Sequence, residues 1–160
     1  MSTETPAAPV PTEEATPAGR ACVVVLGGHR FAVDVSDARE VVVLDATTPV
    51  PGAPPAVIGV MNLRGNILPV VEARPLLGLP ARPPTDRALV LADGEHRAAV
   101  LVEAVLGLTT LDVLPPYPDA TGGLTAGELN ADTGGRVTLL DGRAVLAALR
   151  RAWKPGPGGS

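Results

Sequence analysis

The feature that most constrains the fold of this 160-residue chain is an internal repeat. The segment His29–Leu44 reads HRFAVDVSDAREVVVL and His96–Leu111 reads HRAAVLVEAVLGLTTL, so six of sixteen aligned positions are identical at an offset of 67 residues. Further along, Glu72-Ala73-Arg74 parallels Asp141-Gly142-Arg143 at an offset of 69. These two matches predict two similar units of roughly 60 to 70 residues. Because units of this size bury little apolar surface alone, we expect them to pack on each other.

Short β-strands joined by tight turns dominate the expected secondary structure. Runs rich in β-branched residues flank Gly27-Gly28 and Asp93-Gly94, which are dipeptides typical of two-residue hairpin turns. A further hairpin is predicted at Arg64-Gly65-Asn66, where Gly65 can adopt a positive φ. The expected strands are Ala21–Leu26, Arg30–Val35, Glu40–Leu44, Val57–Leu63, Ile67–Val71, Arg87–Ala92, Arg97–Val102, Leu106–Leu111, Leu124–Asn130 and Arg136–Leu140.

One helix is expected near the C-terminus, over Gly142–Trp153. Asp141 can cap its first turn, and its apolar residues form one stripe at helical spacing, consisting of Val145, Leu146 and Leu149. The expected fold class is therefore mostly β, with two small, strongly bent antiparallel barrels packed together and short helices.

The two ends of the chain differ from its body in composition. Residues 1–20 hold four prolines among Thr, Glu and Ala and lack a secretory signal, so we expect a disordered tail there and another over residues 154–160. The ordered body, residues 21–153, then forms a single domain of two barrel subdomains. Its longest charge-free stretch, Ala46–Leu63, contains four prolines and does not suit a membrane-spanning helix.

The residue inventory argues against catalysis. His29 and His96 are the only histidines and occupy equivalent positions after the two hairpin turns. We interpret both as polar residues at strand edges without a catalytic role. Cys22 lies in an apolar strand and predicts a buried thiol, and one cysteine with two distant histidines does not form a zinc site. No phosphate-binding or nucleophile-elbow motif is present. We therefore expect no catalytic residues, no cofactor and no metal.

Charge excludes a further class of partner. The chain carries 13 basic and 17 acidic residues, a net charge of −4, and no basic run. A chain with this balance lacks the positive surface that neutralises a phosphate backbone, so we expect no nucleic-acid binding.

The most distinctive stretch is Pro51–Leu79, which reads PGAPPAVIGVMNLRGNILPVVEARPLLGL. Gly59 permits a bend or a close backbone approach inside a strand. Arg64 stands at the tip of a tight hairpin. On local chemistry alone, this guanidinium is either a solvated turn residue or a planar fork that recognises the carboxylates or carbonyls of a partner.

This stretch resembles the signature of the CheW-like domain family. The family pattern is a proline-rich loop, apolar-x-Gly-apolar-x-Asn-Leu-Arg-Gly, then Pro-apolar-apolar-Asp-apolar-Arg and a short Leu-rich helix. The matching residues are Pro51, Pro54, Ile58, Gly59, Val60, Asn62, Leu63, Arg64, Gly65, Pro69, Val70, Val71, Glu72 and Arg74. Glu72 replaces the usual Asp, Ala38 is smaller than the usual Val or Ile, and Tyr117–Gly123 is an added polar loop.

The resemblance implies two five-stranded SH3-like barrels and a non-enzymatic adaptor. Such proteins couple methyl-accepting chemoreceptors to a CheA-type histidine kinase. The implied partners are the cytoplasmic receptor tip and the regulatory domain of the kinase. The protein is then a cytoplasmic monomer, recruited to membrane-associated arrays only through receptors.

The resemblance also implies a set of partner-binding residues. Glu40 and Arg64 match positions near the groove that accepts receptor helices, and Gly59 and Asn62 shape the same surface. Leu89, in the hairpin of the second repeat, completes the candidates although it matches no sharp motif.

Three alternatives stay open from the sequence. The Ala38 departure leaves room for a CheW-like protein of another pathway, or for a competitor that binds kinase but no receptor. A β-barrel that binds a small molecule between its subdomains is disfavoured, because aromatic residues are scarce and few polar anchors are available. The residue inventory disfavours an enzyme.

Overall fold

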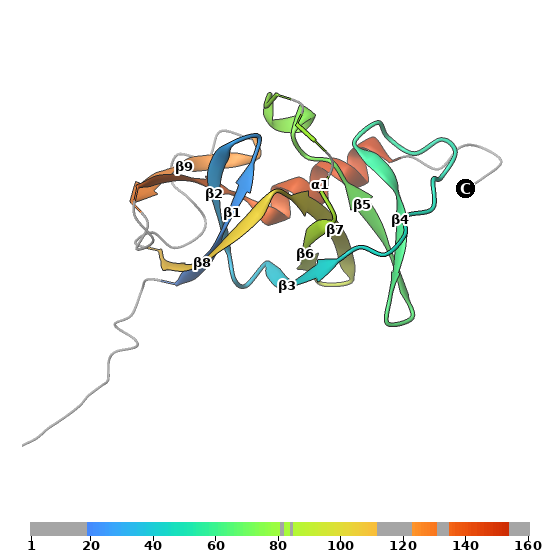
Figure 1. Cartoon of the computed structure of the whole chain (residues 1–160), viewed down its shortest axis with the longest axis horizontal. Coiled ribbons are helices and arrows are strands. Elements are labelled where there is room, and N and C mark those ends of the chain that lie inside the picture. Colours follow the sequence, from blue (N-terminus) through green and yellow to red (C-terminus); the bar gives the residue numbers. More distant parts are fainter. Residues whose placement is uncertain (1–18, 81, 84, 112–122, 131–134, 154–160) are drawn as a thin grey trace, which may run out of the picture.

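The structure is a computed structural model in which residues 19–80, 82–83, 85–111, 123–130 and 135–153 are described (Figure 1). The expected tails lie outside these residues except for Gly19 and Arg20, and Arg20 is the first residue of a strand rather than part of the tail. Of the expected loop Tyr117–Gly123, only Gly123 is described.

The expected elements are present, with boundaries that differ by at most two residues. The strands are β1 (Arg20–Leu26), β2 (His29–Asp34), β3 (Ala38–Val43), β4 (Val57–Leu63), β5 (Asn66–Val71), β6 (Arg87–Asp93), β7 (His96–Val102), β8 (Ala104–Thr110), β9 (Thr125–Asn130) and β10 (Arg136–Leu140). A 3-10 turn, η3 (Pro75–Leu77), follows β5, and the helix α1 (Gly142–Ala152) follows β10. The prediction of a mostly β chain with a C-terminal helix is confirmed.

The strands form two five-stranded sheets, and each sheet combines two strands of one sequence repeat with three strands of the other. The chain crosses from the first sheet to the second between β2 and β3 and returns between β7 and β8. One sheet has the order β8-β1-β2-β10-β9 and the other β3-β6-β7-β5-β4. We call the first unit barrel 1 and the second barrel 2; they lie side by side along the long axis of Figure 1. Barrel 2 is continuous in sequence, whereas barrel 1 combines the start of the chain with its end. The repeats and the barrels therefore do not coincide, because β3–β5 of the first repeat belong to barrel 2 and β8–β10 of the second repeat belong to barrel 1.

Strand register reproduces both sequence offsets. Ala21 pairs with Asp34 in barrel 1, and Ala88 pairs with Leu101 in barrel 2, each pair shifted by 67. The parallel pair β2–β10 likewise corresponds to the pair β7–β5, with the offset of 69 on β10 and β5. The repeat detected in the sequence is thus a true structural repeat.

The first strand after each crossing, β3 in one case and β8 in the other, carries an equivalent β-bulge. In β3 the register skips Arg39, and in β8 it skips Leu106, which is 67 residues further along. A bulge bends a strand and increases its twist. Both strands begin two residues earlier than the sequence pattern predicted. The reason is that β3 already pairs with β6 from Ala38 onward, and β8 already pairs with β1 from Ala104 onward.

Four central strands are buried on both faces, which explains their nearly continuous apolar sequence. Alternate residues of β1 and β2 point into a small cluster inside barrel 1, formed by Ala21, Val23, Ala32, Leu111, Val137 and Leu139. Alternate residues of β6 and β7 point into the cluster of barrel 2 together with Met61, Leu68 and Val70. Their other faces meet in one larger core between the barrels. This shared core holds the barrels together.

The helix α1 closes the shared core from one side. Val145, Leu146 and Leu149 are buried there, as the apolar stripe predicted, and α1 packs against β6 and β7. The Asp141 carboxylate accepts a hydrogen bond of 3.1 Å from the backbone N–H of Ala144, which confirms the predicted cap.

Candidate partner-binding surface

The hairpin between β4 and β5 is tied to β3 by an ion pair. The Arg64 guanidinium donates a hydrogen bond from Nη2 to Glu40 Oε2, although the two residues lie 24 positions apart. The Arg64 side chain is 67% exposed and that of Glu40 is 35% exposed. The structure therefore brings together two of the predicted site residues on the surface of barrel 2.

Asn62 fixes the shape of the hairpin tip that carries Arg64. Its side-chain oxygen accepts a hydrogen bond of 2.8 Å from the backbone N–H of Gly65. Gly65 has a φ of 89°, and Arg64 itself has a φ of 50°, which is uncommon for a residue with a Cβ. The Asn-Leu-Arg-Gly motif thus encodes a turn in which the arginine is held outward.

Gly59 acts through packing, since it is buried. A Cβ at this position would lie 2.5 Å from Cγ2 of Thr47 and 2.6 Å from the carbonyl oxygen of Thr48. Thr48 and Val60 also exchange two backbone hydrogen bonds, of 2.8 and 2.9 Å. Gly59 therefore lets the segment that follows β3 lie directly against β4, which supports the surface from beneath.

Leu89 does not belong to the surface. It is 3% exposed and packs in the core between the barrels, so its side chain cannot contact a partner. The sequence placed it on a hairpin without distinguishing the two faces of β6, and both of those faces are buried.

Exposed apolar residues on β3 and β8, the first strands after the two crossings, were not predicted from the sequence. Val41 and Val43 point outward from β3, and Leu106 and Leu108 point outward from β8. Val41 and Leu108 occupy equivalent repeat positions. The sequence AREVVV holds three consecutive valines and does not alternate polar with apolar residues, so it carries no signal that separates the exposed valines from the half-buried Val42. Large apolar side chains exposed together are typical of surfaces that bind other proteins.

A network of charged residues locks the junction between the barrels. Arg74 pairs with Glu72. Its Nη1 also lies 3.1 Å from Oε2 of Glu103, the residue between β7 and β8. The Glu103 carboxylate also accepts hydrogen bonds from the backbone N–H groups of Gly27, at 2.7 Å, and Gly28, at 3.1 Å. Arg82 lies 3.4 Å from Glu103 Oε1.

The network lowers the pKa of both glutamates. For Glu72 the hydrogen bond from the Arg74 side chain is the largest cause. For Glu103 burial raises the pKa, but the two glycine amides, Arg82 and Arg74 together outweigh it, so the net pKa lies below the ordinary value. Both carboxylates are therefore held in their charged form, and Glu103 binds the β1–β2 turn to barrel 2.

Asp37 forms the corresponding contact on the other crossing segment. Its carboxylate lies 3.3 Å from Nε of Arg143, the repeat equivalent of Arg74. Burial is the largest influence and raises the pKa of Asp37, while Arg143 lowers it. The two crossings are therefore built alike but differ in their electrostatics.

Within the residues that the structure describes, no group of three or more His, Cys, Asp and Glu side chains could hold a metal ion. Burial raises the pKa of the Cys22 thiol, which favours the unreactive protonated form. In the same part of the chain, α1 and the other helical segment fall short of the length and apolar character that a membrane crossing needs.

The model of the CheW-like domain family matches residues 20–150, nearly all of the described body. The chain belongs to the CheW-like domain family. The chemotaxis protein CheW of Helicobacter pylori is 31% identical to this CheW-like domain over 129 residues, which cover 76% of the chain and 78% of that protein.

Other relatives of this CheW-like domain match over shorter ranges. The chemotaxis protein CheW of Rhizobium meliloti is 37% identical over 98 residues, covering 59% of the chain and 63% of that protein. Protein FrzA of Myxococcus xanthus is 32% identical over 105 residues, covering 64% of the chain and 66% of that protein. The chain thus matches less than two thirds of the length of these two relatives.

A solved structure shares the fold. The scaffolding protein TtCheW of Thermoanaerobacter tengcongensis superposes with a TM-score of 0.65 at 24% identity, covering 76% of the chain and 88% of that protein. This likeness confirms the expected arrangement of two small β-barrels.

Proposed function

We propose that this CheW-like domain is a non-enzymatic adaptor that couples methyl-accepting chemoreceptors to a CheA-type histidine kinase in a chemotaxis or motility array. Family membership supports the class of function. The observation that carries the proposal is the outward-facing Arg64, held by Glu40 of β3. The protein acts in the cytoplasm and reaches the membrane only through receptors.

The Glu40–Arg64 pair suits recognition better than it suits stability. An exposed ion pair contributes about 0–1 kcal/mol to folding. An arginine already held in one orientation, however, loses less conformational freedom when a partner binds. Val41 and Val43 point outward from the other face of β3 and offer apolar area on the strand that holds the arginine. Substituting the pair therefore weakens binding while the fold persists.

The proposed mechanism is scaffolding through modest interfaces. Transient signalling contacts commonly bury less than about 1,200 Å² in total. A micromolar dissociation constant corresponds to roughly −8 kcal/mol, which permits reversible assembly. Many such contacts repeated in an array raise the effective affinity without new contacts. Two barrels fixed by a shared core hold two partners at a constant separation.

The pair can be tested with single and double charge reversals. We expect Arg64→Glu and Glu40→Lys each to weaken association with a receptor cytoplasmic fragment or the kinase regulatory domain by about tenfold, which corresponds to loss of about 1.4 kcal/mol. The double variant places the positive charge on β3 and the negative charge on the hairpin, so an ion pair forms again. It recovers part of the affinity if the ion pair acts by orienting the hairpin. The dissociation constant for each partner is measured separately, with the receptor fragment or the kinase regulatory domain immobilised on a surface.

The exposed pair Arg136–Glu128 between β10 and β9 provides the matched control. Arg136→Glu removes an ion pair of similar exposure on barrel 1 and is expected to leave both affinities unchanged. Equal affinities of the Arg64→Glu variant and the wild type for both partners would remove this surface from the proposal. Wild-type binding to kinase without measurable binding to receptor would favour the alternative of a kinase-binding competitor.

A further inference from the structure

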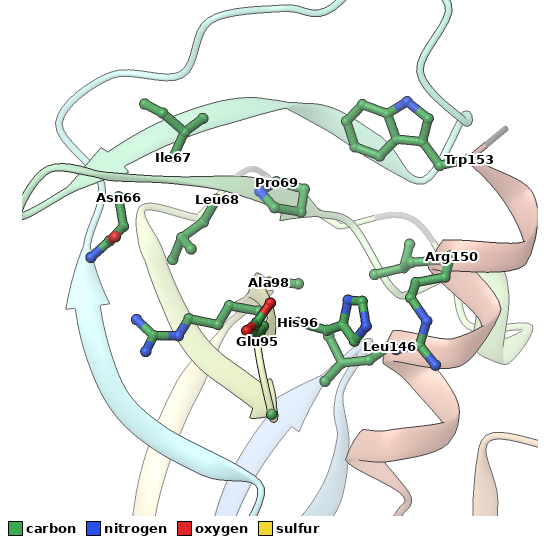
Figure 2. A pocket seen from close by; sticks show the side chains of 13 residues that line it. Asn66, Ile67, Leu68, Pro69, Glu95, His96, Ala98, Leu146, Arg150 and Trp153 are labelled. Atoms are coloured by element: carbon green, nitrogen blue, oxygen red, sulfur yellow. The ribbon is translucent and has the colours of Figure 1, made fainter. Parts of the chain in front are cut away.

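A separate groove lies between barrel 2 and the C-terminal half of α1. It has a volume of about 780 Å³ and is lined by residues of β5, the turn between β6 and β7, and α1. Figure 2 shows Asn66 and Ile67 toward one end, with Arg150 and Trp153 on the α1 side and His96 and Leu146 between. The groove contains neither Glu40 nor Arg64, although Arg97 at its edge also lines the adjoining hollow that holds Glu40.

The floor and one wall of the groove are apolar. Leu68, Leu146 and Leu149 are buried beneath it. Above them, the Ile67 side chain is 63% exposed and Trp153 is half-buried. An exposed isoleucine and a partly exposed tryptophan over a buried leucine floor form the kind of site that takes one large apolar side chain of a partner.

The rim of the groove is positively charged. Arg97 from β7 and Arg150 from α1 both line it, and neither forms an ion pair within the described part of the chain. Glu95 is the only acidic residue among the lining residues. The whole chain, in contrast, carries a net charge of −4. A local excess of unpaired guanidinium groups on an acidic protein attracts an anionic partner specifically to this position.

The shape of the groove selects among anionic partners. It is open along one side, whereas sites for small molecules bury most of their ligand. A nucleic acid would bring a run of phosphates against a chain that has no basic run. A peptide satisfies both features, because alternate side chains can place carboxylates on the arginine rim and an apolar group over the leucine floor.

We propose that this groove binds a short acidic peptide segment of another protein, with a leucine or similar apolar side chain between carboxylates. Arg97 and Arg150 receive the carboxylates from the two sides, and the apolar side chain packs between Ile67 and Trp153. This contact goes beyond the coupling function and does not depend on it.

The groove contains its own reporter, since Trp153 is the single tryptophan of the chain. The probe is an acetylated and amidated heptapeptide that alternates glutamate with leucine, titrated into the full chain while the emission of Trp153 is followed. We expect a saturable change in emission. The same peptide with serine in place of leucine, or with lysine in place of glutamate, is expected to bind about tenfold more weakly.

Charge reversal identifies the rim. The double variant Arg97→Glu with Arg150→Glu is expected to weaken binding of the acidic peptide by about tenfold and to bind the lysine peptide more tightly than the wild type does. Arg151→Glu is the matched control, because Arg151 is exposed on the same helix but does not line the groove. It is expected to change the affinity by less than about twofold. Because these arginines are exposed, the variants should stay folded, and Arg150→Glu and Arg151→Glu, which each place a negative charge in the last turn of α1, should lower the urea midpoint by a similar small amount.

Several results would overturn the proposal. These are an absent change in Trp153 emission at millimolar peptide, equal binding of the leucine and serine peptides, and equal losses in the Arg151→Glu and double variants. Sedimentation of the free chain tests another occupant of the groove. A dimer that Arg150→Glu dissociates would assign the groove to a second copy of the chain and would also overturn the proposal.

Discussion

The chain crosses between the barrels twice, from β7 to β8 and from β2 to β3. The repeat relates the two crossings, yet the charged residues around them differ. At one crossing Arg74 is 7% exposed and joins two glutamates, and Glu103 of this pair also binds the β1–β2 turn. At the other, the Arg143 side chain is 64% exposed and pairs, among the described residues, with Asp37 alone. Equivalent positions in a duplicated fold therefore took different roles. The ion pairs at the first crossing are largely buried, whereas the ion pair at the second is closer to one on the surface.

The largest contrast is expected when each arginine is replaced by methionine, which keeps most of the apolar stem. Arg74→Met removes the arginine that pairs with Glu72 in a largely buried site and takes one of several partners from Glu103, so it should lower the free energy of unfolding by about 3 kcal/mol. Arg143→Met removes an exposed partner and should cost about 1 kcal/mol or less. Urea unfolding at constant slope measures both. Equal costs would mean that the two crossings do not differ in the way proposed.

A difference in acid sensitivity is the next effect in size. The pKa values of Glu72 and Glu103 are lowered, so their contribution to stability is present above the unfolded value of about 4.5 and is lost as pH falls through the folded value. The pKa of Asp37 is raised, so its contribution is present below the unfolded value of about 3.8 and is lost as pH rises through the folded value. The two crossings thus respond to acid with opposite sign.

Amide substitutions separate these two responses. Glu103→Gln should cost about 1–2 kcal/mol at pH 7 and progressively less at lower pH, because the wild type loses the charged interaction there as well. Asp37→Asn should cost less at pH 7, since it removes a buried charge that the fold already disfavours. Unfolding free energies across the acid range provide the measurement. A larger loss for Asp37→Asn at pH 7 would reverse the assignment.

The smallest effect concerns the residues that start the two helical segments. Asp141 caps α1, while Glu72, its equivalent, accepts a hydrogen bond from the backbone N–H of Arg74. Asp141→Ala should cost about 1 kcal/mol, and Asp141→Asn should cost little because it keeps the acceptor. Thermal unfolding of the two variants compares them directly. An equal loss in both would attribute the effect to charge rather than capping.

Local turn chemistry made much of the fold predictable. Gly27-Gly28 and Asp93-Gly94 identified two hairpins whose registers match at the offset of 67. The exchange of β3–β5 and β8–β10 between the repeats was not predictable in the same way, because the repeats are similar enough for these strands to suit either sheet. Leu89 illustrates a related limit. A strand buried on both faces has no alternation, so its sequence does not reveal which side chains are exposed.

The candidate site was predictable in its residues but not in its contacts. The Asn62–Gly65 turn follows from a local motif, since an asparagine side chain commonly bonds to the backbone a few residues further on. The contact between Arg64 and Glu40 joins a hairpin tip to another strand, and the Arg74–Glu103 contact joins the two repeats. Pairings of this kind depend on the tertiary fold, which residue spacing alone does not encode.

The central claim, that this domain couples receptor to kinase, is tested most directly by reconstituting the three components. Kinase autophosphorylation is measured with receptor cytoplasmic fragments assembled on vesicles, with and without the chain. The account predicts that receptor control of kinase activity requires the wild-type chain, and that Arg64→Glu reduces this control while Arg136→Glu preserves it. Receptor control of equal size with and without the chain would contradict the account.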